Sequence, residues 1–465
     1  MKRRIFRLVF VIMLIAFASA VHYAWVSFPI ISGFDAKQMC SCVFVSGRDQ
    51  KDLDTSEFSG FPLSLAKNEV SFHDSSVTST VLGMAKKKAF YRKGIGCTLI
   101  NDVAEKELRA QVFSIPPAPL VNTYTIPWPN GDKIIDSISS TLNKDKLRAA
   151  VDKIFTEPYP DKKQRTRAVV ILYNGQLVAE KYAPGFNKNT KMYGWSMGKS
   201  VTGALIGILV KQGKLNVDQP APVPEWNYEK DQRHAITLKN LLQQTSGLNF
   251  SEDYSKASDV TNMLYKKGNM AAFTANHSLA HNPGTVFNYS SGNSNILSRI
   301  IRQTVGEKNY SAWPATELFY KIGMYNTLPE PDASGTYVGS SYINATARDY
   351  ARFGLLYFND GVWEGERILP EGWVRQSTTS PAANNLKNYG YQFWINGYKK
   401  DKPSQREYPD VPTDMFYCDG YAGQAIYIIP SKSLVIVRLG LTLDKSFDEN
   451  SFLKSIIEAL DGETK

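Results

Sequence analysis

Histidine and cysteine are scarce in this chain. Its 465 residues include five His and four Cys, too few for a protein built around several metal ions. With 43% hydrophobic and 21% charged residues, the composition is globular and excludes a disordered, collagen-like or coiled-coil chain. The sequence shows no internal repeat. We expect two or three structural units, no metal and no cofactor.

Basic residues exceed acidic ones, but they are not gathered in one place. The formal net charge is +10, and four basic residues fall within the first seven positions. The densest run in the body is Lys86–Lys88, followed by Arg92 and Lys93. Nucleic-acid surfaces carry more basic residues with more interleaved aromatics. We therefore interpret this run as a solvated face and expect no nucleic-acid partner.

A long stretch near the N-terminus lacks charge of either sign. Residues 8–34 contain no Lys, Arg, Asp or Glu and follow four cations, which is the pattern of an export signal. Ala18-Ser19-Ala20 fits a cleavage site, whereas Leu8–Pro29 supplies the roughly 20 apolar residues of a spanning helix. Both outcomes stay open for residues 1–34, and we favour a retained anchor with its N-terminus in the cytoplasm. The body is exported and faces the periplasm or cell exterior, or is secreted if the signal is cleaved.

Export permits disulfides. We expect Cys97 to pair with Cys40 or Cys42. A Cys-x-Cys metal site is the alternative, disfavoured because no His or further Cys pair accompanies it. Cys418 stands apart and is expected to be a buried free thiol. Residues 35–150, rich in Ser and Thr with two Pro clusters, are interpreted as an extension and linker.

The domain expected over residues 151–460 begins with a strand signal. Two β-rich runs flank Asn174-Gly175 in Arg167–Tyr182, which predicts a hairpin. Val201–Val210 is apolar all round and predicts a buried helix. Further helices are expected at 238–244, 293–304, 347–358 and 451–460, and further strands at 389–394, 424–429 and 434–440. This order predicts an α/β (α+β) fold, with an antiparallel sheet built from both ends, flanking helices and an inserted helical subdomain.

Ser196 satisfies two catalytic patterns at once. It begins Ser-x-x-Lys with Lys199 and is the centre of Gly-x-Ser-x-Gly between Gly194 and Gly198. The second pattern, in an α/β-hydrolase, needs an apolar strand running into the first Gly. Polar Asn187–Lys191 stands there instead, and no His closes the chain as a late triad member. An α/β-hydrolase-type esterase is therefore the alternative.

The Ser-x-x-Lys pattern fits its setting better. A Ser in the first turn and a Lys three residues later share one helix face. The apolar helix that follows places Lys199 largely out of water, which favours the neutral amine and makes it available as a base. The same spacing at Ser64–Lys67 and Ser451–Lys454 lacks this setting and is assigned to the surface. His277 and His281 lie four residues apart without a third zinc ligand and are assigned to a connecting segment.

Five ordered segments resemble the serine β-lactamase and penicillin-binding-protein superfamily, specifically its class C-like branch with β-lactamase-fold esterases and aminohexanoate-oligomer hydrolases. The resemblance covers about residues 150–460 and implies a β-lactamase-type fold and an acyl-enzyme on Ser196 during ester or amide hydrolysis. The segments are Ser196–Ser200, Ile236–Leu248, Pro283–Gly292, Ala345–Gly354 and Arg367–Pro370.

The resemblance also implies roles for single residues. Tyr289 would be the catalytic tyrosine and act with Lys199 as general acid and base. Ser291 stands where class C enzymes have Asn, and its hydroxyl still accepts a hydrogen bond from the lysine. The same intact set of Ser196, Lys199 and Tyr289 argues against a binding protein of this fold without turnover, which is the second alternative.

The third family element, normally Lys-Thr-Gly or His-x-Gly, corresponds to Gly420–Gln424. Gly423 would allow close substrate approach, and the backbone N–H of Gln424 would complete an oxyanion hole with that of Ser196. Tyr421 replaces the cation. Because this substitution disfavours a β-lactam carboxylate, we expect a small-molecule ester or amide substrate.

Overall fold

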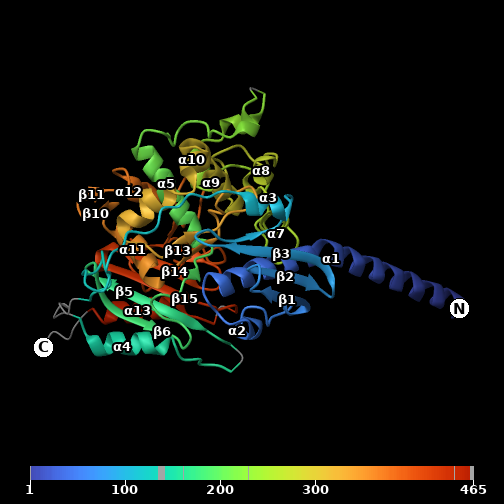
Figure 1. The fold of residues 1–465 in the computed structure, drawn as a ribbon, viewed down its shortest axis with the longest axis horizontal. Helices are drawn as coiled ribbons and strands as arrows, with labels where there is room; N and C mark the ends of the chain where they lie inside the picture. The colour runs from blue at the N-terminus through green and yellow to red at the C-terminus, as the bar shows by residue number, and fades with distance from the viewer. Residues whose placement is uncertain (1, 135–141, 161, 229, 445, 461–465) are drawn as a thin grey trace. The chain divides into compact units, whose positions relative to one another are not determined.

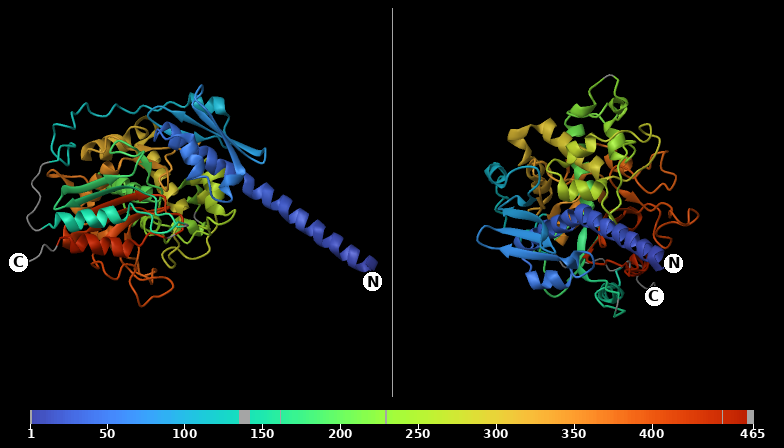
Figure 2. Two further views of the ribbon diagram at one scale, coloured as in Figure 1. Left: turned by 90° about the horizontal axis from the view of Figure 1, so that it is seen from below. Right: turned by 90° about the vertical axis from the view of Figure 1, so that its right-hand side faces the viewer.

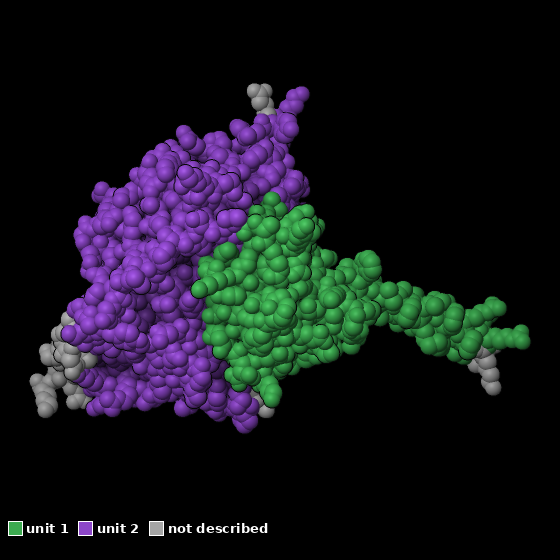
Figure 3. Space-filling model, viewed as in Figure 1, with its two compact units in different colours: residues 1–111, 250–270, 332–335 green, residues 112–249, 271–331, 336–465 purple. Residues whose placement is uncertain are grey.

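The computed structural model describes residues 2–134, 142–160, 162–228, 230–444 and 446–460 (Figure 1). The chain forms two compact units, coloured separately in Figure 3. Part of the expected linker, residues 135–141, lies outside the described residues. Unit 1 comprises residues 1–111, 250–270 and 332–335, and unit 2 comprises residues 112–249, 271–331 and 336–465.

Unit 1 combines a long helix with a four-stranded antiparallel sheet. The strands follow each other in sequence order, β1-β2-β3-β4, and the second half of the helix is buried against them. Sequence analysis missed this sheet because its strands are rich in polar residues, as in β3 with three consecutive lysines. The elements are α1 (Lys2–Phe44), α2 (Gln50–Thr55), η1 (Leu63–Leu65), β1 (Ala66–Ser71), β2 (Ser76–Val81), β3 (Met84–Arg92), β4 (Gly96–Leu99), α3 (Glu105–Ala110) and α7 (Asp259–Lys266).

Helix α7 comes from within the sequence of the expected main domain but packs in unit 1. The ring of its Tyr265 lies 5.5 Å from that of Phe34 on α1, edge to face. A second short return, residues 332–335, also belongs to this unit. There Ala333 is buried with Phe90 and Leu108. Unit 1 is therefore built from three separate pieces of the chain.

The expected disulfide is confirmed, and it joins Cys40 of α1 to Cys97 of β4. Cys42 and Cys418 are buried thiols outside it. The disulfide fixes the buried half of α1 to the last strand of the sheet, and it takes Cys40 away from the metal site that was the alternative.

The first half of α1 is apolar and exposed. Residues 3–23 are all exposed, and a window of this helix reaches a mean hydropathy of 2.3. The helix continues unbroken through Ala18-Ser19-Ala20 into the buried half. One long apolar N-terminal helix is compatible with either a signal or a membrane anchor.

Unit 2 is centred on a six-stranded antiparallel sheet in the order β12-β13-β14-β15-β5-β6. Helices α5 and α11 contribute to the apolar cluster on one face. Helices α4 and α13 lie side by side over the other (Figure 2). The sheet strands are β5 (Thr166–Tyr173), β6 (Gln176–Tyr182), β12 (Trp394–Ile395), β13 (Phe416–Gly420), β14 (Gln424–Ile429) and β15 (Leu434–Gly440), and these helices are α4 (Lys144–Lys153), α5 (Met197–Lys211), α11 (Ala347–Phe358) and α13 (Glu449–Glu458).

The expected hairpin and the last two predicted strands are confirmed. Asn174 and Gly175 both have positive φ, at 50° and 74°, as a two-residue hairpin turn requires. The strand predicted at 389–394 is wrong, because Gln392 adopts a φ of 59° and only Trp394–Ile395 forms a strand. Strand β13 was missed, since Asp419 and Gly420 are poor strand formers.

The remaining helices include those predicted at 238–244 and 293–304, with shifted ends. They are α6 (Leu238–Leu242), α8 (Met270–Ala275), α9 (Ser291–Val305), α10 (Glu307–Tyr310), α12 (Trp373–Ser377), η2 (Pro224–Trp226), η3 (Gln232–Ala235), η4 (Ala315–Phe319), η5 (Tyr320–Ile322) and η6 (Pro430–Lys432). The remaining strands are β7 (Met192–Tyr193), β8 (Leu328–Pro329), β9 (Ile343–Ala345), β10 (Val362–Trp363) and β11 (Glu366–Arg367).

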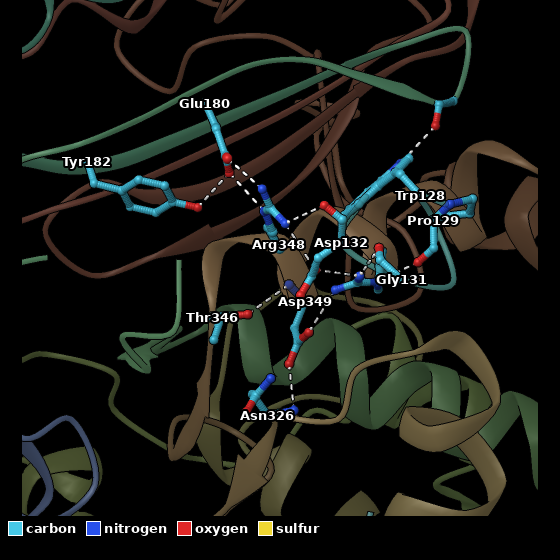
Figure 4. Close-up of polar contacts among 12 residues, drawn as sticks. Trp128, Pro129, Gly131, Asp132, Glu180, Tyr182, Asn326, Thr346, Arg348 and Asp349 are labelled. Atoms are coloured by element: carbon cyan, nitrogen blue, oxygen red, sulfur yellow. Dashed lines mark hydrogen bonds and ion pairs between the residues drawn. The ribbon is translucent and has the colours of Figure 1, made fainter. Parts of the chain in front are cut away.

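Two buried arginines of α11 hold the proline-rich segment around residue 130 (Figure 4). Arg352 donates to the carbonyl oxygens of Pro129 and Gly131 at 2.7 and 2.8 Å and pairs with Asp132. Arg348 bridges Asp132 to Glu180 of β6. Burial alone would raise the pKa of Asp132, but the two guanidinium groups hold it below its usual value. The segment is thus docked by charge, and the loss of one partner would leave a buried charge uncompensated.

Removal of the disulfide should loosen unit 1. Cys97→Ser opens a loop of 57 residues and is expected to lower the opening free energy of unit 1 by about 2–4 kcal/mol, measured by hydrogen exchange of its peptides. Cys418→Ser, which removes a buried thiol of unit 2, is the control. Equal protection of unit 1 in both variants would contradict the prediction.

Candidate active site

Ser196 stands at the N-terminal end of α5, directly after a tight turn. Trp195 before it adopts a φ of 49°, a conformation that costs a bulky residue about 1–3 kcal/mol and is concentrated at functional sites. Gly194 is needed in this turn, since an added Cβ would lie 2.6 Å from the hydroxyl of Tyr350. The turn leaves Ser196 partly exposed, as a nucleophile must be.

Lys199 lies one turn further along α5 and is 1% exposed. Its Nζ donates to Ser196 Oγ at 3.0 Å, to Ser291 Oγ at 3.0 Å and to the carbonyl oxygen of Ser340 at 3.1 Å. The structure therefore brings together three of the residues predicted from the sequence. Ser340 was not predicted.

This set of contacts suits both protonation states of the lysine. An ammonium group has three N–H donors, and three oxygens accept them. A neutral amine has two donors and one lone pair. The Ser340 carbonyl and the Ser291 hydroxyl then accept the two N–H groups, and the lone pair faces the Ser196 hydroxyl. The amine is thus placed to take the proton of the nucleophile.

The two supporting oxygens are themselves held in place. Ser291 begins α9, and Asn293 in the same first turn donates to Gln244 Oε1 at 2.8 Å and accepts from Ser246. The loop after α6 therefore fixes the start of α9, which explains the family-like segment 236–248. Ser340 donates its N–H to Asn295 Oδ1 at 3.2 Å, and this bond positions the segment whose carbonyl accepts from the lysine.

Tyr289 faces the lysine with its ring. The centroid of the ring lies 4.8 Å from Lys199 Nζ, within the range of a cation–π contact. Trp394 of β12 stacks on the same tyrosine at 5.2 Å, and Tyr389 meets it edge to face at 5.7 Å. These contacts fix the ring of Tyr289 beside the amine of Lys199.

Strand β13 passes the turn before the nucleophile. An added Cβ at Gly420 would lie 2.2 Å from the carbonyl oxygen of Gly194, so the two backbones are in close contact. Tyr421, 53% exposed, meets Trp195 edge to face with ring centroids 5.4 Å apart. Tyr421, which the sequence resemblance aligns with the Lys or His of the third family element, therefore lies next to Trp195, the residue before Ser196.

Gly423 and Gln424 both have structural roles that the sequence did not suggest. Gly423 has a φ of 79°, and a Cβ there would lie 2.3 Å from the guanidinium of Arg438. The Gln424 side chain is buried and bonds to Gly440 through both its amide nitrogen and its oxygen. The glycine makes room for an arginine, and the glutamine ties β14 to β15. Their roles toward substrate stay predictions.

Asp419 is a titratable neighbour of Lys199 that sequence analysis missed. It lies on β13, two residues before Tyr421. Burial raises its pKa to about 8, Glu449 and Glu407 act in the same direction, and Lys199 acts in the opposite one. A carboxyl group that is largely protonated at neutral pH therefore lies within the field of Lys199. No local motif marks it, since an isolated Asp in a strand has no signature.

The two histidines considered as zinc ligands lie elsewhere. His277 packs edge to face on Phe273 at 4.9 Å, and His281 is exposed. Across the part of the chain that the structure describes, no group of three or more His, Cys, Asp or Glu side chains is placed to hold a metal ion.

A Ser-x-x-Lys pair with a buried lysine at the start of a helix, beside an antiparallel sheet, is the arrangement that the sequence resemblance implied. A model of the family described as Beta-lactamase matches residues 151–451. The chain belongs to the beta-lactamase family. Its unit 2 is therefore a hydrolase of the serine β-lactamase fold, and the predicted fold class is confirmed.

Relatives within the beta-lactamase family include amide hydrolases, esterases and β-lactamases. The 6-aminohexanoate-dimer hydrolase of Paenarthrobacter ureafaciens is 25% identical over 309 residues, covering 60% of this chain and 75% of the relative. A family VIII carboxylesterase structure has a TM-score of 0.54 at 16% identity, covering 69% and 97% of the two chains. A class C β-lactamase solved with cefoxitin has a TM-score of 0.51 at 16% identity, covering 68% and 100%.

The raised pKa of Asp419 predicts a pH-dependent gain for Asp419→Asn. Between about pH 4 and 8 the folded wild type keeps a proton that its unfolded state releases, so its stability falls as pH rises. The Asp419→Asn variant has no carboxyl group at this position, so its stability does not fall with pH for this reason. Its advantage in urea unfolding should grow by about 1–3 kcal/mol from pH 5 to pH 8, at no more than about 1.4 kcal/mol per pH unit.

Asp401→Asn is the control for this experiment, because Asp401 is exposed and should show the same difference at both pH values. A constant advantage of Asp419→Asn across the range would contradict the burial of its carboxyl group.

Proposed function

We propose that this protein is an exported, membrane-anchored serine hydrolase that cleaves an uncharged ester or amide through an acyl-enzyme on Ser196. The observation that carries the proposal is the buried Lys199 amine, which is hydrogen-bonded to Ser196, Ser291 and Ser340 at once. A structural lysine needs acceptors, but it does not need one of them to be a partly exposed serine at a helix N-terminus.

The proposed reaction has two halves. Ser196 Oγ attacks the substrate carbonyl carbon while its proton passes to the neutral amine of Lys199. The proton then goes, with Tyr289 as relay, to the leaving oxygen or nitrogen as its bond to the carbonyl breaks. In the second half water attacks the acyl-enzyme, the same groups take its proton, and Ser196 regains a proton as the acid leaves. The N-terminus of α5 stabilises the negative oxygen in both halves.

Aromatic residues surround this centre and support an uncharged substrate. Trp195 and Tyr421 pack together next to the nucleophile, and Tyr289 and Trp394 stack beside the lysine. The relatives named for amide and ester hydrolysis agree with this class of reaction. A tyrosine in place of the family cation gives a carboxylate only a neutral hydroxyl.

The membrane part of the proposal rests on α1. Its exposed half contains an uncharged segment that begins at Leu8 and, with the residues that follow, is long enough to span a bilayer. The helix also runs without a break across the Ala18–Ala20 segment into a half that is buried in unit 1 and crosslinked through Cys40. With positive charge on the short N-terminal side, the folded body lies on the outer side of the membrane.

The catalytic set should act as one unit. Ser196→Ala is expected to abolish labelling by a fluorophosphonate probe. Lys199→Ala and Tyr289→Phe should each lower kcat/KM on a p-nitrophenyl ester by about 10²–10⁴-fold, and the double variant should be little worse than either single one, because members of a unit are non-additive.

Ser64→Ala is the matched control, since Ser64 and Lys67 share the same spacing in unit 1, where Ser64 is exposed. It should label and turn over like the wild type. Full labelling of Ser196→Ala, or loss of labelling in Ser64→Ala, would overturn the assignment of the nucleophile.

Substrate preference provides a separate prediction. The protein should turn over a short-chain p-nitrophenyl ester with a higher kcat/KM than nitrocefin. Tyr421→Lys should improve nitrocefin by about tenfold, because a hydrogen bond to a charged partner is worth about 1.4 kcal/mol more than a neutral one. Faster wild-type turnover of nitrocefin, or a gain of Tyr421→Lys on the ester alone, would contradict it.

A further inference from the structure

Three large apolar side chains of unit 1 are exposed on two segments whose neighbouring residues pack into one apolar cluster. Phe61 is 77% exposed, Leu82 67% and Met84 53%. Leu82 and Met84 flank Gly83 at the turn between β2 and β3, and Phe61 lies in the loop that leads into η1. Single exposed apolar residues are ordinary, whereas a group of them marks a contact surface.

This group lies next to the point where α1 becomes buried. Val81, at the end of β2, packs with Phe28 and Ile31 of α1. The same cluster is contacted by Ala24 of α1, by Ala85 after the turn, and by Leu63 and Leu65 of η1. The β2–β3 turn and η1 therefore adjoin the level of Ala24–Phe28 on the long helix.

The length of the exposed helix puts a lipid boundary at the same level. Leu8–Trp25 is an uncharged stretch of 18 residues in helical conformation, and at 1.5 Å per residue it is about 27 Å long. That is close to the roughly 30 Å hydrocarbon thickness of a bilayer. When α1 spans a bilayer through this stretch, the outer headgroup layer lies at the level of the exposed apolar turn.

Leu82 also has an unfavourable backbone. Its φ is 50°, and a two-residue hairpin turn prefers Asn at that position. The β5–β6 hairpin of the same chain meets this preference with Asn174-Gly175. At Leu82 neither turn geometry nor burial favours leucine, so the fold itself gives no reason for this side chain.

We propose that the turn Leu82–Met84 and Phe61 insert into the headgroup region of the bilayer that α1 spans. The exposed Lys86 on β3 and Lys67 on β1 would face anionic phospholipid headgroups. The insertion gives unit 1 a second contact with the membrane and fixes its tilt about α1. This inference rests on the retained anchor of the proposed function.

The test uses the full-length protein in vesicles of phosphatidylethanolamine and phosphatidylglycerol. Single cysteines at Met84, Phe72 and Leu14 carry an environment-sensitive NBD group, and lipids with spin labels in the headgroup or deep in the acyl chain act as quenchers. Phe72 is the matched control: it is 74% exposed at the β1–β2 turn, where it contacts Phe44 at the other end of α1. The unsubstituted protein measures labelling of the native thiols.

Quenching of Met84→Cys by headgroup labels, of Leu14→Cys by deep labels and of Phe72→Cys by neither is the expected result, with at least a threefold difference between positions 84 and 72. Quenching at position 14 alone overturns the inference and leaves the anchor standing. Quenching at none of the three, or a mature N-terminus at Val21 by intact mass, overturns the anchor as well. Equal quenching at 72 and 84 shows general adsorption and also overturns the inference.

A second variant separates membrane contact from folding. Leu82→Asn supplies the residue that the turn prefers and should keep or raise the melting temperature. In the Met84→Cys background it should reduce headgroup quenching at least twofold. A lower melting temperature, or unchanged quenching, would show that Leu82 serves the fold or nothing at all, and would overturn the inference.

Discussion

The fully buried amine of Lys199 is the constraint on which unit 2 depends. A buried amino group without partners is costly, and here each of its three acceptors comes from a different part of the chain. Ser196 is at the start of α5, Ser291 at the start of α9, and Ser340 in the segment before β9. The fold must therefore bring two helix N-termini and one loop to a single point, and the catalytic geometry follows from meeting that demand.

The residues around the site hold these three oxygens in position. The loop after α6 presents Gln244 and Ser246 to the first turn of α9, and Asn295 one turn later orients Ser340. Trp195 takes up an unfavourable φ so that Ser196 can begin α5 in reach of the amine. Polar groups and backbone strain of this kind lower stability in a well-packed region. Their presence here therefore indicates a functional site.

Much of this architecture could be predicted because its signals are local. Asn174-Gly175 marks its hairpin, continuous apolar runs mark β14, β15 and α5, and the Ser196–Lys199 spacing predicts two side chains in contact at the start of α5, which the structure shows. The Ser340 carbonyl could not be found this way, since every residue has a carbonyl and only the fold decides which one faces the lysine. The β1–β4 sheet escaped prediction because its strands are rich in polar residues. Its pairing with α1, and the return of α7 to unit 1, are non-local.

The central claim is that Ser196 becomes acylated during turnover, and trapping that intermediate tests it most directly. A slowly deacylating p-nitrophenyl ester is mixed with the full-length protein in detergent and quenched in acid within one turnover, and the digest is analysed by mass spectrometry. The account predicts the acyl mass on the peptide that contains Ser196, at close to one per chain. Acylation of any other residue, or product release with no covalent species, would contradict it.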